Sequence, residues 1–191
     1  LTLSLEELKD WMRLNGHKAF NAMQVYEWIY KKHFIHFDSM SNLSKTLREL
    51  LDNHFVIQPF IKKTAYPAKN GSATKYVFIC KDNLAIESVV IHNDKDDTLC
   101  LSSQVGCAVN CSFCLTGKMG LLRQCSYTEI LSQYLVLKHT HPKLKNIVFM
   151  GMGEPLHNLK AVLPAIECLT DAKGFELGKR HITVSTSGYL A

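Results

Sequence analysis

Hydrophobic residues recur at helical spacing from residue 1 to about residue 55. Leu5, Leu8 and Met12 share one face of a first predicted helix. Ser4 and Glu7 have the spacing of a capping box at its start, and Asn15-Gly16 ends it. The same spacing predicts two further helices, over residues 19–32 and 44–53.

The pattern then changes to a period of two. Asn70-Gly71 and Asp82-Asn83 are typical turn pairs and divide this stretch. The segments around them are predicted strands of a small antiparallel sheet, over residues 57–66, 74–80 and 84–92. The polar run 93–97 follows and is the expected domain boundary.

From Thr98 onward, strands and helices alternate. Ser126 and Glu129 form a second capping box, and Pro164 lies inside the last helix, where proline is unfavourable. The predicted strands cover residues 98–103, 146–150 and 180–186, and the predicted helices cover 126–139 and 159–170. This alternation favours parallel strands joined by right-handed crossovers.

The predicted fold class is therefore α/β with an α+β accessory domain. Residues 1–93 form that accessory domain, with helices up to residue 55 and the antiparallel sheet over 56–93. Residues 94–191 form the N-terminal half of a (βα)6 partial barrel. A closed barrel of eight units needs about 250 residues. Because the chain starts at Leu1 without a methionine and stops directly after an expected strand, we expect a truncated protein.

Composition narrows the class of protein. The 191 residues are 47% hydrophobic, which is enough for one or two domains with real cores. No segment has the length of a membrane span or the basic start of a signal peptide, so we expect a cytoplasmic protein without a membrane partner. Seven cysteines then indicate reduced thiols and metal chemistry more than a disulfide framework. The net charge of +5 is compatible with a nucleic-acid partner but does not require one.

Three of these cysteines, Cys107, Cys111 and Cys114, form the most informative motif. Closed zinc sites and ferredoxin clusters use four ligands, whereas three thiolates hold three corners of a [4Fe–4S] cube and leave the fourth iron open. The alternatives are a zinc site completed by Cys100 or Cys125, or buried free thiols. The spacing, with Gly106 and Asn110 suited to a tight loop, favours the cluster.

Two polar turns end the later strands. Gly151-Met-Gly-Glu-Pro155 follows the second strand, where its glycines permit close approach of a ligand and Glu154 can accept hydrogen bonds from an ammonium group. Ser185-Thr-Ser-Gly188 ends the third strand, and Thr183, Ser185 and Ser187 share a polar face by alternation. An ordinary turn and a solvated edge strand are the alternatives. Ligands bind beyond the carboxyl ends of parallel strands, where both turns and the cysteine loop are expected.

Together these motifs resemble those of radical S-adenosylmethionine (SAM) RNA methyltransferases that modify adenine, the RlmN/Cfr family. The resemblance spans nearly the whole chain and is strongest from about Glu87. The matching stretches are Leu99–Cys107, the cysteine triad, Phe149–Leu156 and Lys179–Gly188. Glu154-Pro155 resembles the housekeeping, RlmN-like branch.

The resemblance implies a role for each matching residue. Cys107, Cys111 and Cys114 would ligate a [4Fe–4S] cluster. SAM contacts map to Gly153, Glu154 and Ser185. Cys100 matches the cysteine that resolves a protein–RNA covalent intermediate. Glu87 matches the family's proton acceptor, whereas its strand position alone favours an exposed charge at the sheet edge. Alternation along its strand independently places Cys100 with Ser102 and Gln104 on a polar, lumen-like face.

The implied reaction is methylation of carbon 2 of an adenosine in 23S ribosomal RNA and in some tRNAs. One SAM methylates a cysteine near the family's C-terminus, and a second is cleaved reductively at the open iron. That methyl-carrying cysteine has no counterpart in this chain, which puts the activity of the isolated chain in doubt. Expected partners are the RNA and an electron donor such as flavodoxin or ferredoxin, with the enzyme a monomer.

Two other functions fit the same motifs. One is another radical-SAM enzyme, such as a glycyl-radical activase. The other is a non-catalytic iron–sulfur module that binds RNA or transfers electrons. Release of deoxyadenosine on reduction separates the enzymes from an electron carrier, and dependence on RNA separates the methyltransferase from the activase.

Overall fold

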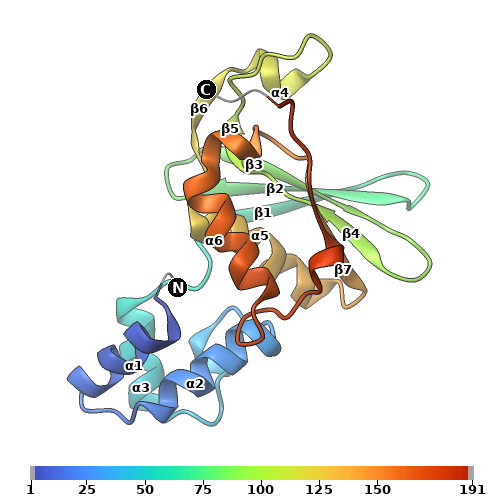
Figure 1. The fold of residues 1–191 in the computed structure, drawn as a ribbon. Coiled ribbons are helices and arrows are strands. Elements are labelled where there is room, and N and C mark those ends of the chain that lie inside the picture. The colour runs from blue at the N-terminus through green and yellow to red at the C-terminus, as the bar shows by residue number, and fades with distance from the viewer. Residues whose placement is uncertain (1–2, 189–191) are drawn as a thin grey trace.

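The computed structural model describes residues 3–188, and its N-terminal part is a compact group of helices (Figure 1). They are α1 (Leu5–Leu14), α2 (Phe20–Tyr26), a π-helical turn (Glu27–Lys31), a short 3-10 helix (Phe37–Ser39) and α3 (Lys45–His54). Both bonds of the capping box predicted at Ser4 are present. Leu8 and Met12 are fully buried, as the helical spacing predicts. The second predicted helix is also helical throughout, but it widens to a π-turn over its last five residues.

The sheet has six strands in the order β1-β2-β3-β4-β7-β8. The strands are β1 (Phe60–Pro67), β2 (Ala73–Cys80), β3 (Ala85–Ile91), β4 (Asp97–Cys100), β7 (Leu144–Phe149) and β8 (Ile182–Val184). Pairing is antiparallel from β1 to β4 and parallel from β4 to β8. The three antiparallel strands are thus confirmed, but they do not form a sheet of their own. Because β3 pairs with β4, the expected boundary at residue 93 is a turn inside one continuous sheet.

Two of the expected parallel strands are shorter than predicted. The first ends at Cys100, after which the chain leaves the sheet and forms β5 (Gln104–Gly106), paired with β6 (Leu121–Gln124) in a separate two-stranded sheet. The last begins as a 3-10 turn (Lys179–His181), and its strand covers three residues. Pairing with β7 ends at Val184, and beyond it the amide of Ser187 donates a hydrogen bond to the Glu154 carboxylate at 2.8 Å.

Helices α5 (Tyr127–Thr140) and α6 (Leu159–Thr170) cover one face of the sheet, and no helix formed by residues 3–188 covers the other face (Figure 1). The capping box at Ser126 and the helix containing Pro164 are both as predicted. Helix α5 is buried almost all round, because the N-terminal helices reach it on the side away from the sheet. Phe175 joins these layers, with its ring 5.0 Å from those of both Tyr30 and Tyr134. Within residues 3–188, no helix is both long and apolar enough to cross a membrane.

A buried amide fastens α5 to the sheet. The side-chain oxygen of Gln133 accepts hydrogen bonds from the Ser88 hydroxyl (2.7 Å) and the Ser102 amide (2.9 Å). Its nitrogen donates to the Ser102 carbonyl at 2.9 Å. All three residues are at most 1% exposed, so water cannot replace these bonds. Gln133 therefore sets the position of the helix at the point where the chain leaves β4 for the cysteine loop.

We predict that Gln133→Met lowers the free energy of unfolding by about 2–4 kcal/mol, because it leaves several buried polar groups unpaired while conserving volume. Gln24→Met is the matched control, since Gln24 accepts one side-chain bond, from Asn21, and its loss should cost less than about 1 kcal/mol. Urea unfolding monitored by circular dichroism measures both. Equal stability of the two variants would show that the Gln133 bonds do not fix the helix.

Candidate functional site

The three cysteines lie in a loop closed at its base by the β5–β6 hairpin. Cys107 donates its backbone amide to the Gly120 carbonyl at 3.0 Å, and the amide of Cys114 bonds the carbonyl of Cys111 at 3.0 Å. Gly106 has a positive φ of 79°, and a Cβ there would lie 1.9 Å from the Gly120 oxygen. Only glycine fits this crossing. The loop then ends in the short helix α4 (Leu115–Lys118), directly after Cys114.

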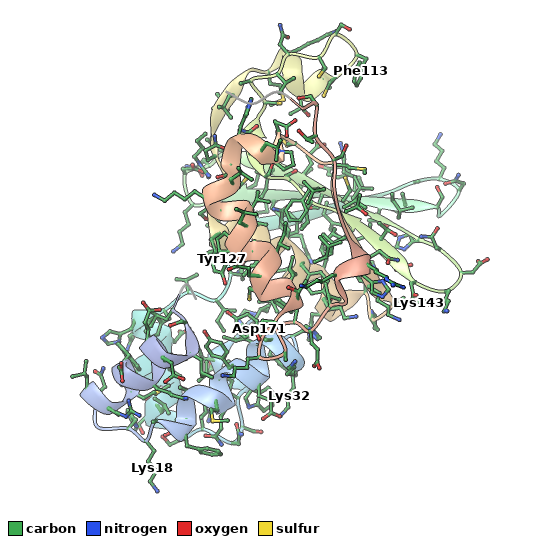
Figure 2. All side chains as sticks on the ribbon, viewed as in Figure 1. Lys18, Lys32, Phe113, Tyr127, Lys143 and Asp171 are labelled. Carbon is green, nitrogen blue, oxygen red and sulfur yellow. The ribbon has the colours of Figure 1, made fainter. Side chains whose placement is uncertain are left out.

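The thiols of the triad line one cavity of about 310 Å³. Cys107 is 9% exposed, while Cys111 and Cys114 are partly exposed. Phe113, which is 90% exposed, projects from the same loop at the top of the molecule (Figure 2). Among the described residues, no fourth cysteine lines the cavity. The donor set therefore fits a cluster held by three thiolates better than a closed zinc site completed by Cys100 or Cys125.

The two polar turns reach the same cavity, as their positions at strand ends predict. Its further lining includes Gly153, Glu154 and Ser185, together with Gly151, Pro155, Thr186 and Ser187. The carboxyl ends of β7 and β8 thus face the cysteine loop across one hollow. All six residues expected to hold the cluster and SAM line this cavity.

Gly151 and Gly153 line the cavity on one side and lie against other parts of the chain on the other side. A Cβ on Gly153, whose φ is +100°, would lie 2.5 Å from the side chain of Gln104. A Cβ on Gly151 would lie 2.6 Å from the Leu101 carbonyl oxygen. We expected these glycines to admit a ligand, but their nearest neighbours are the segment that leads into the cysteine loop. Because they lack side chains, they allow this turn to pack directly against the segment that leads into the cysteine loop.

Glu154 is 4% exposed, and both oxygens of its carboxylate are bound. One oxygen accepts from the Leu156 amide (3.0 Å), and the other from the amide (2.8 Å) and hydroxyl (2.9 Å) of Ser187. Its own amide donates to Gln104 at 2.8 Å. Desolvation acts to raise the pKa of Glu154, but the hydrogen bonds from Ser187 and Leu156 outweigh it and the pKa is lowered. The carboxylate is therefore ionised at neutral pH.

Cys100 and Glu87 do not line this cavity. They lie on the face of the sheet without helices, since Cys100 is paired with Val89, whose side chain points to the same face as that of Glu87. The Glu87 carboxylate lies 3.1 Å from the ammonium of Lys75 and is 45% exposed. Burial raises the pKa of the Cys100 thiol, against a smaller opposing effect of the Met150 backbone.

Ser102 and Gln104 do not form the lumen face that alternation predicts for them. Both are fully buried, and the strand ends before them. Ser102 accepts a hydrogen bond from the Met152 amide at 2.9 Å, and Gln104 binds Glu154 and, at 2.9 Å, Gln124. Both side chains therefore brace the site from within the protein.

Three residues support the site through contacts that their sequence positions did not predict. Gln104 and Ser187 are ordinary polar residues whose partner, Glu154, is 50 and 33 positions away. Arg123 binds both oxygens of Glu129 at 2.9 Å, and Asp82 at 2.5 Å. These side-chain bonds raise the pKa of Arg123, and they fix the hairpin of the cysteine loop to α5 and to the β2–β3 turn. For Ser187, its place in a polar run at a strand end is the one available hint.

Two family models match the chain. The model for the ribosomal RNA large subunit methyltransferase N-terminal domain matches residues 1–57, and that for the radical SAM superfamily matches residues 101–191. The second match implies a [4Fe–4S] cluster and SAM as cofactors. Neither model covers the antiparallel strands between them.

Curated relatives and a solved structure agree with these matches. A probable dual-specificity RNA methyltransferase RlmN of Aquifex aeolicus is 44% identical over 98% of this chain and 54% of its own length. The dual-specificity RNA methyltransferase RlmN of Geotalea uraniireducens is 43% identical, with the same coverage. The crystal structure of a radical SAM methyltransferase from Sphaerobacter thermophilus superposes with a TM-score of 0.89 at 36% identity, over 98% of this chain and 56% of that one.

The chain spans about half the length of these relatives, and the match runs through both of its parts. The helical N-terminal region, the cysteine loop and the strand-end turns all fall within it. The chain therefore belongs to the RlmN family of the radical SAM superfamily.

Proposed function

We propose that the protein to which this chain belongs is a radical SAM RNA methyltransferase that methylates carbon 2 of an adenosine in 23S ribosomal RNA and in some tRNAs, through a methyl-cysteine intermediate. The observation that carries the proposal is the single cavity shared by the cysteine triad, Gly153, Glu154 and Ser185. The match of residues 1–57 to an RNA methyltransferase domain favours this function over a glycyl-radical activase or an iron–sulfur electron carrier.

In this proposal the thiolates of Cys107, Cys111 and Cys114 would hold the [4Fe–4S] cluster, and SAM would bind beside it. The cluster supplies the electron that activates SAM, while the protein positions both and restricts water. Gly153 and Ser185 offer backbone and hydroxyl groups beside the triad. The ionised Glu154 presents negative charge where the SAM ammonium group would bind, and its Ser187 and Leu156 bonds keep it from swinging toward the cluster.

Cys100 and Glu87 serve the later steps in this proposal. Glu87 accepts a proton from the substrate, and Cys100 resolves the protein–RNA adduct. Their positions on neighbouring strands of one sheet face support a shared task. Lys75 pairs with Glu87 and so fixes the orientation of its carboxylate. An electron donor such as flavodoxin or ferredoxin, a monomeric state and a cytoplasmic location complete the proposal.

Anaerobic reconstitution of the chain should yield about four irons per chain with broad visible absorbance. Cys111→Ser should lose most of that iron, because it removes one of three ligands. Cys168→Ser is the matched control, since Cys168 lies on α6 and lines a different cavity. Iron determination and visible spectra provide the measurement. Stoichiometric tetrahedral zinc without visible absorbance would contradict the cluster.

Glu154→Gln should weaken SAM binding by about tenfold or more while iron content stays unchanged, because a hydrogen bond to a charged group contributes about 1.5–3 kcal/mol. Equilibrium binding of SAM to the reconstituted chain measures the effect. Ser187→Ala is the control, because it removes one hydroxyl that anchors the carboxylate but keeps the charge, and it should weaken binding less. A folded Glu154→Gln variant with unchanged SAM affinity would refute the assignment of Glu154.

The roles of Cys100 and Glu87 require the full-length protein. Cys100→Ala should bind SAM, attack RNA and then stall, leaving a protein–RNA crosslink that survives denaturation, because no thiol releases the adduct. Glu87→Gln should lose turnover and retain the cluster, since an amide does not accept a proton at neutral pH. Denaturing gels with labelled RNA separate these outcomes. Normal turnover of Cys100→Ala, or loss of its cluster, would make Cys100 a structural residue.

A further inference from the structure

A second group of metal-binding side chains lies at the other end of the sheet from the cysteine cavity. His92 follows β3, Asp97 begins β4, and His141 caps the C-terminus of α5. One ligand atom from each residue lies within 4.8 Å of the others. Figure 2 labels Lys143, two residues beyond His141, at the lower right, far from Phe113 on the cysteine loop. This group therefore has no part in the cofactor site.

Each of the three side chains also makes a hydrogen bond to a further polar group outside the cluster. The Tyr76 hydroxyl lies 2.6 Å from Nε2 of His141, and the Thr74 hydroxyl lies 3.0 Å from Nε2 of His92. The amide of Asn93 donates to Oδ1 of Asp97 at 3.3 Å. Such outer contacts orient the imidazoles and carboxylates of metal sites. They leave Nδ1 of His92 and Oδ2 of Asp97 for an ion, with a ring nitrogen of His141 as the third donor atom.

One pair of the inner atoms has the separation expected of two ligands on a shared ion. Nδ1 of His92 lies 3.3 Å from Oδ2 of Asp97. A hydrogen bond between a charged carboxylate and an imidazolium is usually about 2.7–2.9 Å long. Two ligands bound about 2.0–2.1 Å from a tetrahedral zinc ion are about 3.3 Å apart. The side chain of Asp97 is 8% exposed and that of His92 is 30% exposed, so the group is sheltered but reachable from solvent.

We propose that His92, Asp97 and His141 form a binding site for a divalent transition-metal ion, with zinc as the representative ion. Two imidazole nitrogens and one carboxylate oxygen are a donor set that such ions prefer, and water completes the coordination. The ion ties the ends of β3 and β4 to the end of α5. It thus stabilises the junction between the antiparallel and parallel parts of the sheet. The site is independent of the proposed methyltransferase activity.

Zinc titration of the 191-residue chain tests the site, with Cys107, Cys111 and Cys114 changed to serine so that the triad does not compete for the ion. We expect stoichiometric zinc binding and a rise in melting temperature on its addition. His141→Gln should abolish both, while Tyr76→Phe, which removes an outer contact, should weaken binding by about 10–100-fold. His139→Gln is the matched control, because His139 is an exposed histidine of the same helix.

Cobalt spectra identify the ligands of the bound ion. A site of nitrogen and oxygen donors gives weak visible bands without the intense near-ultraviolet absorption of cobalt–thiolate bonds. Thiolate absorption would place the ion on one of the remaining cysteines and overturn the proposal. So would an absence of zinc binding, or equal zinc affinity in His141→Gln and His139→Gln variants that both fold by circular dichroism.

Discussion

The buried carboxylate of Glu154 is the interaction on which the geometry of the cavity depends. It joins the end of β7 to the segment after β8, and the amide of the same residue reaches the start of β5. Hydrogen bonds to a charged group contribute about 1.5–3 kcal/mol each. Three such bonds offset the cost of burying the charge, and their donors are 2 and 33 residues away in sequence. A single residue thus links the segments that form the wall of the cavity opposite the cysteines.

This arrangement constrains what the site residues can be. Glu154 connects two segments of the site and, in our proposal, also binds SAM. A substitution of Glu154 would therefore affect both functions together. The neighbouring Gly153 is fixed for the same reason, because any side chain there would collide with Gln104. On the other side of the cavity, the base of the cysteine loop is constrained in the same way, because a side chain at Gly106 would collide with the Gly120 carbonyl.

Local chemistry made much of the fold and of the site predictable. The capping boxes at Ser4 and Ser126 depend on residues three apart, and both helices begin where the boxes predict. Parallel strands bring their carboxyl ends to one edge, which is why the triad, Glu154 and Ser185 were expected together and line one cavity. Gln104 could not be found this way. Its role comes from a contact across 50 residues, and its apparent alternation with Cys100 suggested the wrong environment. The pairing of β3 with β4 was also not predicted, because a polar turn within one sheet has the same composition as a linker between two domains.

Cys100 lies on the sheet face that no helix of the described residues covers, yet its side chain is partly buried. Burial raises the pKa of Cys100 and keeps it protonated, and only the thiolate attacks or binds metal strongly. Cys100 therefore competes poorly with the triad for iron, although it lies only seven residues before Cys107. In the function proposed above, Cys100 would have to lose its proton at the step in which it resolves the adduct, because the same burial favours the neutral thiol. Glu87 lies on the adjacent strand of that face, two residues before the partner of Cys100, and its carboxylate is paired with Lys75. In the proposed function Glu87 takes its proton from the substrate, so a thiol kept neutral on the same sheet face stays available for the later step, and a neutral thiol is a poor permanent metal ligand.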